Sequence, residues 1–144
     1  MSRNFFTKDE QKVIVDAIQE AEKSTSGEIR VHIENHCKIN VIDRASEVFR
    51  LLEMHETKLR NGVLFYIAME DKELAIIGDT GINEQIQDHH WGEIKDHLIA
   101  RFRNEEFTLG LKEAILMTGQ QLKDEFPASE NQENELADEI SFGQ

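Results

Sequence analysis

The segment Val63-Leu64-Phe65-Tyr66-Ile67-Ala68-Met69 is the longest apolar run in the chain, and the fold is built around it. It shows no polar alternation, and a short continuous apolar run is typical of a central strand covered on both faces. The polar break Glu70-Asp71-Lys72 separates it from a second apolar run, Leu74-Ala75-Ile76-Ile77. Two such runs with so short a break between them predict an antiparallel hairpin.

The sequence before this hairpin predicts another strand and two helices. Residues 28–34 alternate strictly, with apolar side chains at Ile29, Val31 and Ile33 and polar ones at Glu28, Arg30, His32 and Glu34. This alternation predicts a strand with one buried and one polar face, at or near an edge of the sheet. Apolar residues at helical spacing predict one helix after the capping-box pair Thr7 and Glu10, and a second from about Val41.

The sequence after the hairpin is helical. We expect a short helix over residues 82–86, a longer one that carries residues 91–102 and a last one that carries residues 111–122. Alternation of strands and helices predicts an α/β domain, in which helices cover a sheet. A strand-helix-strand crossover is almost always right-handed and makes its two strands parallel, so the strand at 28–34 should run parallel to the strand at 63–69.

The domain is expected to span residues 1–126, since the chain length fits one domain. After Pro127 the composition becomes acidic, with no lysine or arginine. Residues 127–144 are therefore expected to form a mobile acidic tail, although Ile140 and Phe142 could dock on the body of the domain.

The charge balance bears on possible partners. Against 16 basic residues stand 29 acidic ones, which gives a formal net charge of −13. Such a field repels nucleic acid and anionic lipid and favours metal ions or basic protein surfaces. The first residues show no export signal, and the apolar run is far shorter than the roughly 20 residues needed to cross a bilayer. We therefore expect a cytoplasmic protein that binds no nucleic acid and does not insert into membranes.

Three polar segments that contain glycine flank the predicted strands, at residues 25–28, 60–62 and 78–81. The first two strands are parallel and the third returns against the second, so all three segments should meet at one edge of the sheet. They supply carboxylate, amide, hydroxyl and guanidinium groups, from Glu28, Asp79, Asn61, Thr25, Ser26, Thr80 and Arg60. The start of the next helix could add oxygens from Asn83 and Glu84. Oxygen ligands of this kind suit a hard divalent cation, calcium or magnesium, better than zinc, although any one of them could instead be a turn or capping residue.

Four sequence blocks, in this order and spacing, resemble the TPM domain family. They are residues 25–31 after an amphipathic helix, Asp43-Arg44-Ala45, residues 57–64 and residues 77–82. The resemblance covers residues 5–126 and implies a three-layer α/β/α sandwich with a small mixed central sheet. Many members are exported and carry a transmembrane helix and a glycine-rich tail after the domain; here an acidic tail stands in that place.

The resemblance also implies a function. Members of the family are reported to bind divalent metals, and we expect calcium ahead of magnesium in this chain. Carried onto this sequence, the metal region would involve Asp79 and neighbouring loop residues, with Asp43 as a further candidate. On the predicted topology, however, Asp43 lies near the opposite edge of the sheet, where it could cap the second helix.

Three functions remain open. The first is a cation-binding domain without catalysis, a sensor or an adaptor for an unidentified protein partner. The second, which the family's acid-phosphatase label suggests, is a metal-assisted phosphomonoesterase. It would use Arg60 and Ser26 to hold the phosphate, and Asp79 or Glu28 as metal ligand or general base. The third is an interaction module, whose partner would bind the acidic tail or the polar strand face formed by Arg30, His32 and Glu34.

Overall fold

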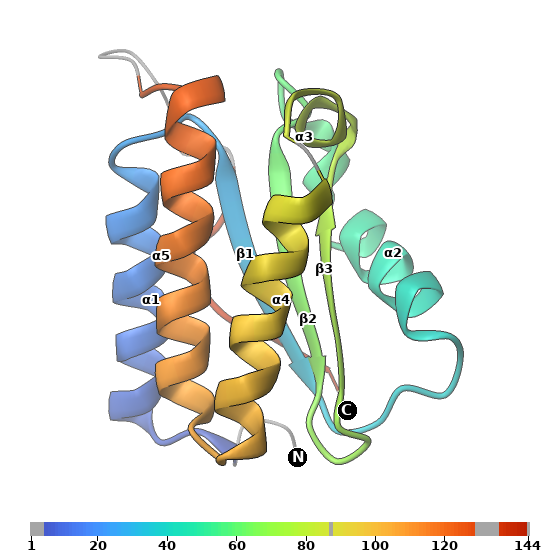
Figure 1. Cartoon of the computed structure of the whole chain (residues 1–144). Coiled ribbons are helices and arrows are strands. Elements are labelled where there is room, and N and C mark those ends of the chain that lie inside the picture. The colour runs from blue at the N-terminus through green and yellow to red at the C-terminus, as the bar shows by residue number, and fades with distance from the viewer. Residues whose placement is uncertain (1–4, 87, 129–135, 144) are drawn as a thin grey trace.

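The computed structural model describes residues 5–86, 88–128 and 136–143, and within them a four-stranded sheet runs through the middle of the molecule (Figure 1). Its strands are β1 (Glu28–Glu34), β2 (Gly62–Ala68), β3 (Glu73–Gly78) and β4 (Ser141–Phe142), in the order β3-β2-β1-β4. β1 pairs with β2 in parallel, and β2 pairs with β3 antiparallel. The predicted hairpin and the predicted parallel pair are confirmed.

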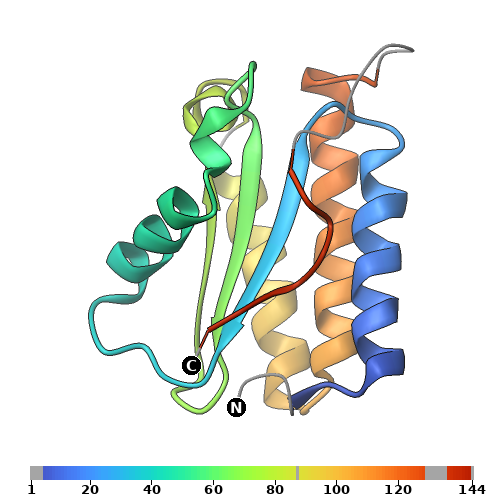
Figure 2. The same ribbon diagram turned by 180° about the vertical axis from the view of Figure 1, so that it is seen from behind.

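Helices cover both faces of this sheet. On one face lie α1 (Lys8–Glu22), α4 (Asp88–Arg103) and α5 (Phe107–Glu125), and on the other lies α2 (Val41–Leu51), followed by the 3-10 turn η2 (Met54–Glu56) (Figures 1 and 2). The short helix α3 (Thr80–Gln85) begins two residues earlier than the sequence predicted. The fold is the three-layer α/β/α sandwich that the resemblance implied.

Local sequence signals explain where the first helices begin. Thr7 caps α1 through a complete capping box with Glu10. The side chain of Asn40 caps α2 by accepting hydrogen bonds from the backbone amides of Ile42 and Asp43. Asp43 therefore lies in the first turn of the helix and does not cap it.

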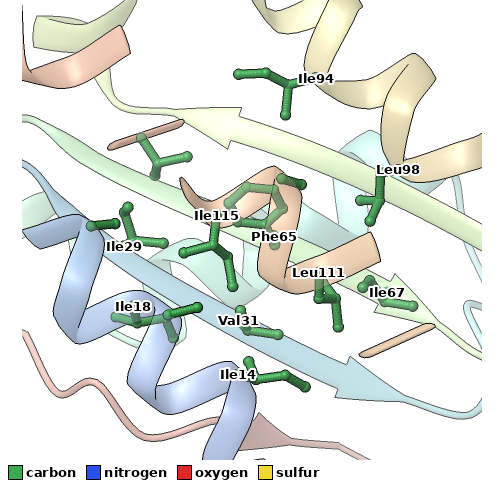
Figure 3. Close-up of a cluster of buried hydrophobic side chains, with 14 of the residues drawn as sticks. Ile14, Ile18, Ile29, Val31, Phe65, Ile67, Ile94, Leu98, Leu111 and Ile115 are labelled. Carbon is green, nitrogen blue, oxygen red and sulfur yellow. The ribbon is translucent and has the colours of Figure 1, made fainter. Parts of the chain in front are cut away.

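The larger core lies between the sheet and the three helices α1, α4 and α5. The apolar face of β1 and one face of β2 meet the inner faces of α1 and α5 there, as Figure 3 shows for Ile14, Ile18, Val31, Phe65, Leu111 and Ile115. A smaller core beneath α2 is formed by the other face of β2 and by residues such as Phe49, Met54 and Tyr66. Every residue of β2 is buried, as the continuous apolar run predicted.

The polar side of β1 differs from the prediction. Glu28, His32 and Glu34 are buried, and Arg30 is half-buried. They are buried because α2 lies on this side of the sheet, and because residues 136–143, here called the C-terminal strap, cross β1 on the same side (Figure 2) and pair with it at β4. We expected a mobile tail over residues 127–144. In the structure the strap, which contains the two residues named as able to dock, Ile140 and Phe142, lies against the domain and adds β4. Residues 129–135 lie outside the described part.

Candidate functional site

The three polar segments meet at one edge of the sheet, as the topology predicted. Backbone hydrogen bonds join them: the Glu28 amide donates to the Asn61 carbonyl (3.2 Å), the Asp79 amide to the Gly62 carbonyl (3.0 Å), and the Gly81 amide to the Arg60 carbonyl (2.9 Å). This edge therefore places Ser26, Glu28, Arg60, Asn61 and Asp79 on adjacent backbone segments. We refer to these five residues as the loop edge.

Within the loop edge, Asp79 is already neutralised by a protein cation. Its carboxylate accepts hydrogen bonds from Arg60 Nε (2.7 Å) and Nη2 (2.8 Å) and from the Thr80 amide (2.7 Å). The Asp79 side chain is 4% exposed, whereas that of Arg60 is 47% exposed. Because both carboxylate oxygens are engaged, Asp79 acts in this structure as the N-cap of α3 and as the anchor of Arg60.

Asn61 has a different environment. The residue is 1% exposed, and its Nδ2 donates a hydrogen bond to Ser26 Oγ (3.3 Å). Its Oδ1 is fully buried and accepts no hydrogen bond from the residues that the structure describes. Glu28, whose backbone pairs with that of Asn61, is also buried. A buried acceptor without a donor is uncommon in folded proteins and calls for an explanation.

The remaining candidates lie outside this centre. Thr80, Asn83 and Glu84 belong to α3. The side chains of Asn83 and Glu84 are exposed, and Asn83 Nδ2 donates a hydrogen bond to the Gly78 carbonyl (3.2 Å). Asp43 lies in α2 beyond the carboxyl end of β1, and therefore at the opposite end of the sheet. Among residues 5–86, 88–128 and 136–143, no group of three or more His, Cys, Asp or Glu side chains is placed to hold a metal ion.

Sequence reasoning missed a buried ion-pair network around Glu34. This carboxylate accepts hydrogen bonds from Arg44 Nε and Nη2 (2.9 Å each), from Tyr66 Oη and from His32 Nε2 (3.0 Å). Burial raises the pKa of Glu34, but the hydrogen bonds from Arg44, Tyr66 and His32 outweigh it and hold the pKa at about 2. The alternation in residues 28–34 placed His32 and Glu34 on one face, but no local signal pointed to Arg44.

The C-terminal strap completes this network and covers it. Arg30 Nη2 donates to the Glu139 carbonyl (3.3 Å), His32 Nδ1 hydrogen-bonds Ser141 Oγ (2.9 Å), and the Gly143 amide donates to the Ile33 carbonyl (2.8 Å). We expected the polar face of this strand to bind a partner, and that expectation stays a prediction. That face already binds the chain's own C-terminal strap.

A carboxyl pair links the strap to α1. Glu22 Oε2 accepts a hydrogen bond from the Ile29 amide (2.8 Å), and the Glu22 side chain also hydrogen-bonds Asp138. Burial, the bond to Asp138 and the nearby charges of Asp138 and Glu28 raise the pKa of Glu22 from 4.5 to about 10. At neutral pH Glu22 is therefore protonated and donates to Asp138.

This pair predicts a loss of stability at high pH. The folded-state pKa of Glu22 lies above its unfolded value, so its contribution is complete below about pH 4.5 and is lost as the pH rises toward 10. A Glu22→Gln variant, which stays neutral, should lose less stability than the wild type between pH 6 and pH 9 in urea unfolding with a chelator present. Glu20→Gln, an exposed change on the same helix, should follow the wild type. Equal pH dependence in all three proteins would contradict the assignment.

The fold and the loop edge together define an α/β/α domain with polar loops gathered at one end of a mixed sheet, and comparison with known proteins agrees with this class. The TPM domain profile matches residues 2–121. The NMR structure of BA42 protein from the psychrophilic bacterium Bizionia argentinensis is 46% identical, with a TM-score of 0.92 and 96% of each chain covered. The chain therefore belongs to the TPM domain family.

More distant solved structures share the fold alone. The N-terminal domain of a protein from P. gingivalis is 19% identical, with a TM-score of 0.70, and the match covers 88% of this chain and 83% of that one. The N-terminal domain of cg2496 protein from Corynebacterium glutamicum is 13% identical, with a TM-score of 0.67, and the match covers 86% of this chain and 78% of that one. No curated protein matches the chain. Among the described residues, no helix is both long and apolar enough to span a bilayer.

Proposed function

We propose that the chain is a calcium-type, divalent-cation-binding domain that acts as a sensor or adaptor without catalysis of its own. The observation that carries this proposal is the buried Oδ1 of Asn61, which accepts no hydrogen bond from the described residues. Leaving such an acceptor unsatisfied costs about 1–3 kcal/mol. A bound cation would satisfy it, and amide oxygens are ordinary calcium ligands.

The neighbouring groups fit the same reading. Ser26 Oγ lies 3.3 Å from Asn61 Nδ2. Glu28 is held next to Asn61, because its backbone amide donates a hydrogen bond to the Asn61 carbonyl. These oxygens, together with Asn61 Oδ1, would hold the cation, and the net charge of −13 would favour its approach. Asp79 could join them only after release from Arg60. With so few carboxylates, we expect a dissociation constant of about 10⁻⁴–10⁻³ M.

The phosphomonoesterase alternative receives less support from the geometry. It requires a guanidinium that is free to clamp a phosphate, but Arg60 already forms a bidentate pair with Asp79. The same pair occupies Asp79, one of the two carboxylates, with Glu28, that were candidates for the general base. Hydrolysis of a chromogenic phosphomonoester that survives both Arg60→Ala and Asp79→Ala would point to a contaminant.

Calorimetric titration of the metal-stripped protein with calcium tests the proposal. We expect saturable binding in the stated range, weaker binding of magnesium, and at least a tenfold loss of calcium affinity in Asn61→Ala, which removes the buried oxygen. Asn83→Ala is the matched control, because this amide is exposed at the same edge and donates through Nδ2 to a backbone carbonyl. Equal affinities of the two variants, or no saturable heat at millimolar calcium, would contradict the proposal.

A further inference from the structure

A groove of about 770 Å³ opens beside the β2–β3 hairpin, at the end of the sheet away from the loop edge. We call it the hairpin groove; it is lined by Val41 and by residues of the segments 67–74 and 95–107. Its volume falls within the range of small-molecule sites in proteins, about 300–1,000 Å³. The proposed cation site uses none of these residues.

The wall of the hairpin groove is apolar. Ile67 is buried, while Leu74, Ile99, Phe102 and Phe107 are half-buried and line the groove with it. Phe102 and Phe107 meet edge to face, with ring centroids 5.1 Å apart, and fix the shape of the wall where α4 gives way to α5. An apolar ligand that covers these half-buried side chains would remove apolar surface from water, which favours binding.

The rim of the groove carries cations. Lys72, Lys95 and Arg103 are exposed there and form no ion pair within the parts of the chain that the structure describes. Arg101, two residues before Arg103, is by contrast paired with Glu113 (2.7 Å) and Glu106 (3.3 Å). In a chain with a net charge of −13, unpaired cations around an apolar groove are a local reversal of the overall field.

We infer that the hairpin groove binds a free amphiphilic monoanion, a carboxylate on an unbranched alkyl chain. The apolar wall would take the chain, and Lys95 and Arg103 would take the carboxylate. Glu73 and Glu105 also line the groove, so three cations face two carboxylates and the excess charge suits a single negative charge. A polyanion such as a nucleotide would meet these two carboxylates and the negative field of the whole chain.

Titration with octanoate and decanoate, below the concentration at which they form micelles, tests this inference. Saturable binding should appear as amide shifts in segments 67–74 and 95–107. Decanoate should bind about tenfold more tightly than octanoate, since each buried methylene contributes a factor of about three to four. Decanol, which has no charge, should bind at least tenfold more weakly than decanoate. Calcium and the Asn61→Ala change should alter none of these affinities.

Two variants and one control complete the test. Lys95→Glu should weaken decanoate binding at least tenfold. Lys123→Glu should leave it unchanged, because it makes the same change of net charge at an exposed residue in the last turn of α5, whereas the groove lies at the first turn of that helix. Ile99→Trp should block the groove without altering its charge. Equal effects of Lys95→Glu and Lys123→Glu, equal binding of decanol, or binding to anionic vesicles without binding to decanoate would each overturn the inference.

Discussion

Replacement of Arg44 by methionine should lower the free energy of unfolding by about 3 kcal/mol, because it strands a buried carboxylate. The Glu34 side chain is 3% exposed, and Arg44 supplies two of its hydrogen bonds. Tyr66 and His32 would remain as partners but carry no fixed positive charge. Methionine keeps much of the apolar stem of arginine, so the loss would report the missing charge. Urea unfolding at pH 7 measures it.

The matched control for this prediction is Arg50→Met. Arg50 is exposed in the same helix and forms no ion pair among the described residues, so its loss should change stability by less than about 0.5 kcal/mol. The pH profile gives a second readout. The depressed pKa of Glu34 stabilises the wild type above about pH 4.5 and this contribution is lost as the pH falls toward 2, so the gap between wild type and Arg44→Met should narrow in acid. A constant gap would contradict the account.

Replacement of Gly81 by alanine should cost about 3 kcal/mol, because the added methyl group has no room. Its Cβ would lie 2.2 Å from the Leu59 carbonyl oxygen and 2.7 Å from the Arg60 carbonyl oxygen. Both are backbone atoms, so relief requires moving the segment that carries Arg60 and Asn61. The variant should therefore also bind calcium more weakly than the wild type, in the same titration as above.

Gly92→Ala provides the opposite control. A Cβ at Gly92 would meet no atom of the described residues within 4 Å, and the position is exposed in the interior of α4. Alanine there should stabilise the protein by about 0.5–1 kcal/mol, since glycine is the poorer helix former. If Gly81→Ala were as harmless as Gly92→Ala in urea unfolding, the close approach of the loops would not exist in solution.

The central part of the fold could be predicted from the sequence because it depends on periodicity and on chain-connection rules. The continuous apolar run at residues 63–69 needs no partner information to be recognised as a buried strand. The right-handed crossover then fixes the parallel pair, and with it the meeting of the three polar segments. The sequence did not predict, however, which polar atoms at that edge pair with one another and which remain without a hydrogen bond. Arg60 and Asp79 were assigned separate roles, whereas the structure joins them.

The polar face of β1 shows why the rest escaped prediction. Alternating polar residues are usually solvent-exposed, and nothing near His32 or Glu34 in the sequence signals otherwise. Their burial depends on Arg44 in the next helix and on the C-terminal strap, more than 100 residues later. The acidic composition of residues 127–144 suggested mobility, but the docking of the strap rests on non-local pairs such as Ser141 with His32. Interactions of this kind leave no local pattern in the sequence.

An amide NMR titration of the metal-stripped protein with calcium, repeated with magnesium, tests the central claim most directly. Our account predicts saturable shifts that cluster at Ser26, Glu28 and Asn61, with smaller ones at Asp79 and Thr80 through the shared backbone hydrogen bonds. Shifts confined to the C-terminal strap or to exposed carboxylates, or no shifts at millimolar calcium, would contradict it.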